Sequence, residues 1–190
     1  MRVVFSVLFD ACVFFPAPLR DFLLTLAETE LFRARWTDQI HEEWTRNLLL
    51  RRPDLNPERL KQTCRTMNQF FPDSLIQGYE DLIPHLTLPD QNDRHVLAAA
   101  IRGRCEIIVT LNLKDFPPSV LNEYDIEAQH PDDFVLNTME LGMDSVLSAI
   151  RKQRARLKNP PKTAEEYLET LERQGLPMTY QRLKGYVELI

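Results

Sequence analysis

The stretch that decides the fold is Val3-Val-Phe-Ser-Val-Leu-Phe-Asp10. Its first seven residues are almost all apolar, β-branched or aromatic, which is typical of a strand buried on both faces in a parallel sheet. Asp10 ends the run at the carboxyl end of the strand, where a doubly wound sheet has its ligand crevice. The same aspartate interrupts the run before it reaches the length of a signal peptide, so we expect no export and a cytoplasmic protein.

Working outward from this strand, helical spacing alternates with further strand patterns. Strands are predicted at residues 31–36 and 107–110, with a short one around Ile126. Helix starts are indicated by Thr37, by Asn56-Pro57 and by the capping box Thr163-Ala-Glu-Glu166. Alternation over about 140 residues predicts an α/β domain with a mostly parallel central sheet and helices on both faces.

Length and composition fit an ordinary globular protein. The 190 residues are 44% hydrophobic and 27% charged, and no apolar run is long enough to span a membrane, so no membrane association is expected. Residues 145–190 show helical patterns and no strand pattern. We therefore predict two parts, an α/β domain over residues 1–144 and a basic helical extension over residues 145–190.

Charge is distributed unevenly along the chain. The net charge is −5, but residues 151–190 hold nine Lys or Arg and five Glu, which gives this part +4 and leaves −9 for residues 1–150. The run Arg151-Lys-Gln-Arg-Ala-Arg-Leu-Lys158 carries five positive charges in eight residues. It is expected either to dock RNA or a peptide partner, or to form an ordinary solvated helix face.

Acidic side chains gather where the predicted topology forms a crevice. Asp10 follows the first strand, and Asn112 and Asp115 follow the strand at 107–110. Glu43 lies beside an apolar helical stripe, whereas its neighbour Glu42 faces a more polar side. Asp90 and Asp93 stand at the head of the helix that ends at Gly103. Each acid alone also fits a cap, a turn or a solvated charge.

Together these carboxylates indicate a cation site. Several carboxylates in one crevice do not all stay ionised unless a cation compensates them, and oxygen ligands without His or Cys select Mg²⁺ or Mn²⁺. Other chemistries find less support, since the four histidines are scattered without a nucleophile and no glycine-rich phosphate loop is present. The three cysteines lack zinc-ligand spacing.

Four segments in this order resemble a PIN domain, the metal-dependent nuclease fold, and more closely the VapC-like toxins of toxin–antitoxin pairs. The segments are Val7-Leu-Phe-Asp-Ala-Cys-Val13, Ile40-His-Glu-Glu-Trp-Thr-Arg-Asn-Leu48, Asp90-Gln-Asn-Asp-Arg-His-Val-Leu-Ala-Ala-Ala100 and Val109-Thr-Leu-Asn-Leu-Lys-Asp-Phe116. The resemblance implies a PIN-like α/β/α sandwich. It also implies an acidic triad of Asp10, Glu43 and Asp93.

The resemblance further implies that Asp115 or Asn112 takes the fourth place and that the Thr110 hydroxyl holds a water or a phosphate. Asn112 stands where the commoner pattern has an aspartate, so the number of metal ions, one or two, stays open. The resemblance therefore implies an endoribonuclease, and a carboxylate set of this kind fits one that uses Mg²⁺ or Mn²⁺ and a metal-activated water. Asp10, Glu43, Asp93 and Asp115 are its expected ligands, with Asp90 nearby.

Partners follow from the same resemblance. Arg46, Arg94 and Lys114 lie next to the acids and are expected either to meet RNA phosphates or to be ordinary surface charges. A protein antitoxin and a homodimer are the other expected partners. The alternatives are a phosphatase or a DNA-directed nuclease on a similar crevice, and a non-catalytic PIN-like module that binds RNA or protein. Asn112 is the residue that keeps the second alternative open.

Overall fold

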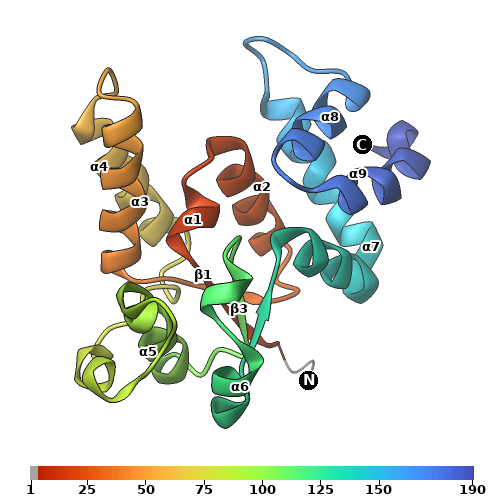
Figure 1. Cartoon of the computed structure of the whole chain (residues 1–190). Coiled ribbons are helices and arrows are strands. Elements are labelled where there is room, and N and C mark those ends of the chain that lie inside the picture. Colours follow the sequence, from red (N-terminus) through yellow and green to blue (C-terminus); the bar gives the residue numbers. More distant parts are fainter. Residues whose placement is uncertain (1–3) are drawn as a thin grey trace. The chain divides into compact units, whose positions relative to one another are not determined.

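The computed structural model describes residues 4–190, which form two compact units (Figure 1). The first unit holds the N-terminal residues up to Phe15 together with Arg33–Gln129. The second holds Pro16–Phe32 and His130–Ile190. The second unit is therefore built from two separate segments of the chain. The predicted division into an α/β domain over residues 1–144 and a basic helical extension over residues 145–190 stays a prediction.

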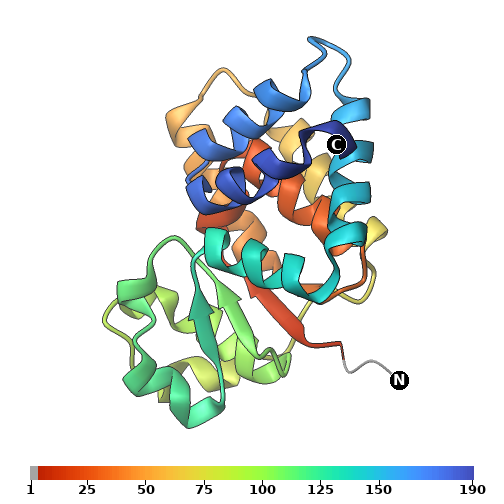
Figure 2. The ribbon, with the colours of Figure 1, turned by 90° about the vertical axis from the view of Figure 1, so that its right-hand side faces the viewer.

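The first unit is built on a four-stranded sheet. Its strands are β1 (Ser6–Phe9), β2 (Arg33–Arg35), β3 (Ile107–Val109) and β4 (Glu127–Gln129), all parallel and in the order β2-β1-β3-β4 (Figure 2). Leu8 pairs with Arg35 on one side and Ile108 on the other. All four residues of β1 are buried, as its apolar run predicts. Val3, where that predicted strand begins, lies outside the described residues.

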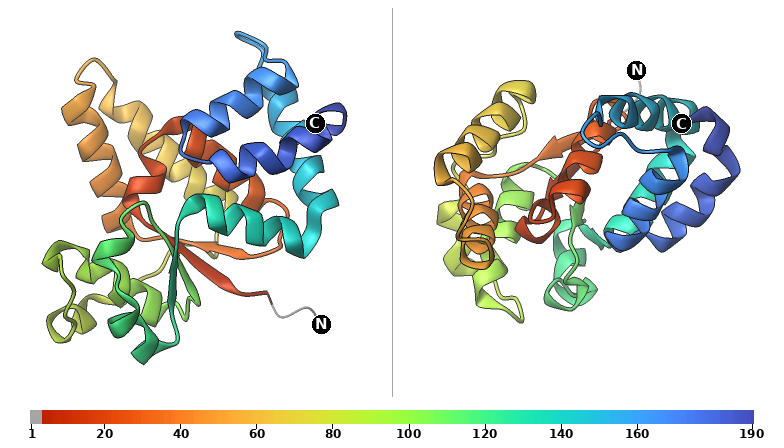
Figure 3. Two further views of the ribbon diagram at one scale, coloured as in Figure 1. Left: turned by 45° about the vertical axis from the view of Figure 1, so that its right-hand side comes forward. Right: turned by 90° about the horizontal axis from the view of Figure 1, so that it is seen from above.

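Helices surround this sheet within the first unit. They are α1 (Ala11–Phe14), α3 (Asp38–Arg51), α4 (Pro57–Phe70), α5 (Arg94–Arg102) and α6 (Pro118–Leu121), with 3-10 turns η1 (Glu80–His85), η2 (Gln91–Asp93), η3 (Leu113–Asp115) and η4 (Asn122–Tyr124). Helix α3 lies beside α4 (Figure 3), and α5 packs against β1. The α/β fold with a parallel central sheet and additional helices is as predicted.

Local capping signals place the helix starts. The Thr37 hydroxyl accepts a hydrogen bond from the Ile40 amide at 3.0 Å, and the Asn56 side chain accepts one from the Glu58 amide at 2.9 Å. Both residues satisfy amides that have no partner inside their helix. Gly103 closes α5, as predicted. The predicted starts at Thr37 and Asn56 are confirmed.

A cluster of aromatic side chains holds α3 in place within the first unit. Trp36 and Trp44 are fully buried, and the Phe14 ring meets Trp36 edge to face with 5.7 Å between centroids. The Trp36 indole donates a hydrogen bond to Asn68 Oδ1 at 2.7 Å, and the Trp44 indole donates one to His41 Nδ1 at 3.1 Å. Buried indoles with satisfied N–H groups give α3 a defined position. Glu43, the neighbour of Trp44, is thereby placed.

The second unit is helical in its described residues. It contains α2 (Ala17–Ala27), α7 (Pro131–Arg156), α8 (Ala164–Arg173), α9 (Pro177–Leu183) and the 3-10 segment η5 (Lys184–Leu189) (Figure 3). Helix α2 packs against α7 and α8. The Thr163–Glu166 capping box is present in both directions, so that prediction is confirmed.

The basic run at residues 151–158 begins in the C-terminal part of α7, which ends at Arg156. Gly142 interrupts α7 with φ −174° and ψ 73°, and a Cβ at this position would meet Leu31 Cδ2 at 3.0 Å. Two of the five charges in residues 151–158 serve the unit itself. Arg154 donates to the Lys162 carbonyl, and Arg156 pairs with Glu28 at 3.3 Å. Among the described helices, none has the length and apolarity needed to cross a membrane.

Candidate active site

Asp10 is the most enclosed acid of the candidate site. It follows β1 directly, its amide donates to the Val109 carbonyl at 3.1 Å, and the residue is 5% exposed. Oδ1 accepts from the Ala11 amide at 2.7 Å, so Asp10 also caps α1. Oδ2 accepts from the Thr110 hydroxyl at 2.7 Å and from the Cys12 thiol at 3.1 Å. Burial raises the pKa of Asp10, although the bonds from Thr110 and Cys12 oppose the rise.

Thr110 connects Asp10 to the loop after β3. Its hydroxyl donates to Asp10 and accepts from the Asn112 amide at 3.0 Å. The amide of Leu111, which lies between Thr110 and Asn112, donates a hydrogen bond to the Cys12 sulfur at 3.2 Å. The carboxyl ends of the two central strands are therefore joined by side chains as well as by the β-ladder. In this arrangement Asn112 contributes its backbone amide, while the residue itself is exposed.

Glu43 reaches the site from α3 and is held by a histidine of α5. His95 Nε2 lies 3.2 Å from Glu43 Oε2, with side-chain exposures of 5% for His95 and 29% for Glu43. The other ring nitrogen, Nδ1, is buried and has no hydrogen-bond partner among the described residues. An imidazole thus fixes one carboxylate oxygen of Glu43 and leaves the other without a bond in this part of the chain.

The pKa of Asp93 reflects the negative charges of the other carboxylates in the cluster. Asp93 is the last residue of η2 and the N-cap of α5. Its pKa is raised to about 7, first by burial and then by the negative charges of Asp10, Asp90, Asp115 and Glu43. Five carboxylates are thus close enough to influence one another. Asp90 also has a local role, because its side chain accepts from the Asn92 amide at 2.8 Å. Asp115 lies half-buried on η3.

The cluster fits a hard divalent cation by chemistry but not as a finished cage. Its donors are carboxylate oxygens, and their mutual repulsion is the kind that a cation relieves. Across residues 4–190, however, no three His, Cys, Asp or Glu side chains are arranged so that they could hold a metal ion. Mg²⁺ keeps several of its waters and is commonly bound by one or two carboxylates, so a complete cage is not required.

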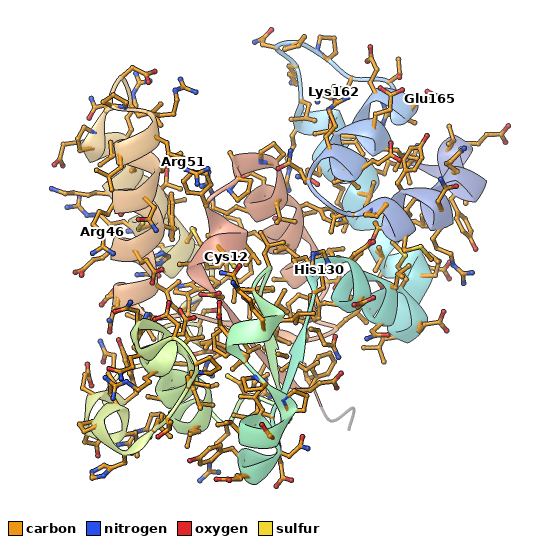
Figure 4. All side chains as sticks on the ribbon, viewed as in Figure 1. Cys12, Arg46, Arg51, His130, Lys162 and Glu165 are labelled. Atoms are coloured by element: carbon orange, nitrogen blue, oxygen red, sulfur yellow. The ribbon has the colours of Figure 1, made fainter. Side chains whose placement is uncertain are left out.

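The three basic residues predicted near the acids differ in their bonding. Arg46 is exposed on α3. Figure 4 labels its side chain and that of Cys12, which lies on α1. Lys114 is exposed on η3. Arg94 is half-buried, and its Nε donates to the Gln91 carbonyl at 3.0 Å. Arg94 therefore supports the turn before α5, whereas Arg46 and Lys114 present their charges to solvent.

Two residues in contact with the acids were not predicted from the sequence. Cys12 is one of the three cysteines that lack zinc-ligand spacing, and His95 is one of the four scattered histidines, yet each touches a carboxylate of the cluster. The local pattern held a usable signal in both cases. Cys12 comes two residues after Asp10, and His95 comes two residues after Asp93 and faces the buried side of α5.

Comparison with known proteins now decides the family. A PIN domain model matches residues 6–114, which is more than half of the chain and includes Asp10, Glu43, Asp93, Thr110 and Asn112. The chain belongs to the PIN domain family. Asp115 lies one residue beyond the matched segment. The resemblance stated from the four sequence segments is confirmed.

The C-terminal part of this PIN domain protein has a match of its own. A model described as the VapC50 C-terminal domain matches residues 131–185, from α7 through α9. A relative from Mycobacterium tuberculosis (strain ATCC 25618 / H37Rv), named "Putative ribonuclease VapC50", is 43% identical over 120 residues, covering 61% of this chain and 70% of the relative. No solved structure gives a significant match.

Proposed function

We propose that this PIN domain protein is a Mg²⁺- or Mn²⁺-dependent endoribonuclease and the toxin of a toxin–antitoxin pair. The observation that carries the proposal is the buried Asp10 at the carboxyl end of β1, which accepts a hydrogen bond from Thr110 just after β3. The charges of Asp10, Glu43, Asp90 and Asp115 also raise the pKa of Asp93, since these acids form one cluster. Family membership and a relative named as a ribonuclease support the proposal. RNA is accordingly the proposed substrate.

Each site residue has a proposed role. Asp10, Glu43, Asp93 and Asp115 would hold the cation, directly or through water. A divalent cation bound there supplies a water of lowered pKa and compensates the charge that develops on the phosphate. Thr110 and Cys12 orient the Asp10 carboxylate by the hydrogen bonds described above. The exposed Arg46 and Lys114 would attract the RNA backbone, which an acidic cluster alone would repel.

The proposal is tested by cleavage of a total-RNA or tRNA mixture with Mg²⁺, Mn²⁺ or EDTA. We expect cutting that requires the metal and is lost in both Asp10→Asn and Asp93→Asn. Asp73→Asn is the matched control, because Asp73 is an exposed aspartate of the same unit in the loop after α4 and should leave cutting unchanged. Cutting that persists in EDTA, or in the two site variants, would contradict the metal-dependent mechanism. The same assay with DNA as substrate distinguishes a ribonuclease from a DNA-directed nuclease, which would cut the DNA.

A second candidate function is a non-catalytic PIN-like module that binds RNA or protein. The observation that favours it is that, in the described chain, no three potential ligands stand ready to hold a metal ion. The neutral Asn112 points the same way. Under this alternative, calorimetry would detect no Mn²⁺ binding and no metal would restore cleavage. The two proposed protein partners need their own experiments. An antitoxin is tested by co-purifying this protein with the product of the gene next to its own, and a homodimer is tested by sedimentation.

A further inference from the structure

The pair of Glu43 and His95 has a feature that the acidic cluster alone does not explain. Among residues 4–190, His95 is the one side chain that forms an ion pair or hydrogen bond with the Glu43 carboxylate, at 3.2 Å. Glu43 sits on α3 and is partly exposed, whereas His95 lies on α5 and is almost completely buried. The two helices meet at the cluster through this contact.

The hydrogen positions on the imidazole follow from its surroundings. A carboxylate has no hydrogen to donate, so Nε2 must carry the hydrogen that joins the two side chains. Nδ1 is buried without a partner in the described residues, so Nε2 is the ring nitrogen through which His95 makes its hydrogen bond. This ring is a fixed single donor aimed at Glu43.

The surroundings of His95 make that donor rigid. The residues that follow it, Val96, Leu97 and Ala98, are completely buried, and α5 packs against the central strand β1. Glu43 has a long flexible side chain that would sample several rotamers if it were unbound. A rigid donor therefore selects one orientation of a mobile carboxylate.

We infer that His95 is a positioning residue, which holds Oε2 of Glu43 and leaves Oε1 as the oxygen available to a divalent cation. The inference rests on the proposed function, because it gives Glu43 the role of a metal ligand. In metal sites the groups that hydrogen-bond a ligand orient it, and their loss typically costs about 10- to 100-fold in metal affinity or activity. His95 does not touch the metal or the RNA in this scheme.

The experiment compares two amide substitutions in the full chain by calorimetric titration with Mn²⁺. In His95→Gln the amide nitrogen lies near the former Nε2 and still reaches Glu43, whereas in His95→Asn the same amide is one methylene too short. We expect His95→Asn to weaken Mn²⁺ binding about 10- to 100-fold and His95→Gln to stay within about threefold of the wild type. Melting temperatures of both variants check that each is folded.

A double-mutant cycle separates positioning from a general effect on the fold. In a Glu43→Gln background, His95→Asn should cause almost no further loss of Mn²⁺ affinity, because the group it positions is already changed. Equal affinities for His95→Asn and the wild type, equal losses in Asn and Gln, or a full additional loss in the Glu43→Gln background would each overturn the inference. Absence of Mn²⁺ binding by the wild type would instead overturn the proposed function.

Discussion

Asp10, a proposed metal ligand, lies in an environment that disfavours its charged form. Its carboxylate is 5% exposed, and burial raises its pKa, which means that the fold disfavours its charged form. We expect Asp10→Asn to lower cleavage by at least about 100-fold, because the electrostatic centre of the site is lost. The same change should leave the melting temperature in EDTA equal or higher, since a buried charge is removed. Calorimetry and a cleavage assay check the two parts, and a clear loss of stability would contradict the second.

Asp93 gives the site a predicted pH dependence. Its pKa is raised from 3.8 to about 7, so between these values the folded protein keeps a proton that the unfolded chain releases. Without metal, this group therefore contributes stability at low pH that is lost as the pH rises towards 7. A cation competes with the proton for the same carboxylate.

The resulting prediction concerns metal-induced stabilisation. We expect the increase in melting temperature caused by Mn²⁺ to be larger at pH 8 than at pH 6, because Asp93 is then ionised before the metal binds. Thermal denaturation with and without Mn²⁺ at the two pH values is the measurement. Asp93→Asn should remove most of the difference, and an equal shift at both pH values would speak against coupling between proton and metal.

At the same scale, the sequence predicted the acids better than the groups that hold them. The positions of Asp10, Thr110 and Asn112 after strands could be predicted because strand ends can be located from local apolar runs. The contacts of Cys12 with Thr110 and of His95 with Glu43 join residues about fifty or more positions apart. Periodicity on one element carries no information on such pairs, since they depend on how elements pack.

At the scale of elements, the N-terminus of α9 is capped by a side chain of α7. Leu176, its N-cap, provides no side-chain bond, and the amides of Met178 and Thr179 instead donate to the two oxygens of Asp132 on α7, both at 2.8 Å. Asp132 is buried. It satisfies two of the amides that any helix start leaves open, so it serves as a cap from a distant part of the chain.

Replacing this cap should destabilise the protein. We expect Asp132→Ala to lower the free energy of unfolding by about 2–3 kcal/mol, because two buried amides lose charged acceptors. Asp133→Ala is a suitable comparison, since Asp133 is its exposed neighbour in the first turn of α7. Urea denaturation of both variants measures the difference, and equal stabilities would contradict the capping role.

Elements were predictable where their signals are local. Three helix starts could be predicted because an N-cap side chain binds an amide within three residues of itself. These N-caps are Thr37, Asn56 and Thr163. The four-residue helix α1 was missed because it is too short to show an apolar period. Residues 131–156 form two helical parts of α7, which the non-helical backbone of Gly142 separates. The partners of α2 were unpredictable, since they lie over a hundred residues away in the sequence.

For the whole molecule, the two-segment composition of the second unit makes a truncation informative. Leu19, Phe22, Leu23 and Leu26 of α2 are completely buried, and α2 packs against α7 and α8. We expect a chain cut after residue 144 to expose part of this apolar face and to aggregate or bind a hydrophobic dye, because the C-terminal part of α7 and all of α8 are then missing. Circular dichroism, dye binding and sedimentation measure this. A monomeric, cooperatively melting fragment would instead support the predicted boundary between residues 144 and 145.

The order of these segments has a consequence for synthesis on the ribosome. Helix α2 ends at Ala27, and α7, against which it packs, begins at Pro131. At roughly 5–20 residues per second, about a hundred residues take about 5–20 s to translate. Throughout that interval the nascent chain carries an amphipathic helix whose partners do not yet exist. Chaperones that shield apolar segments are therefore expected to matter for the yield of this protein until its last sixty or so residues have emerged.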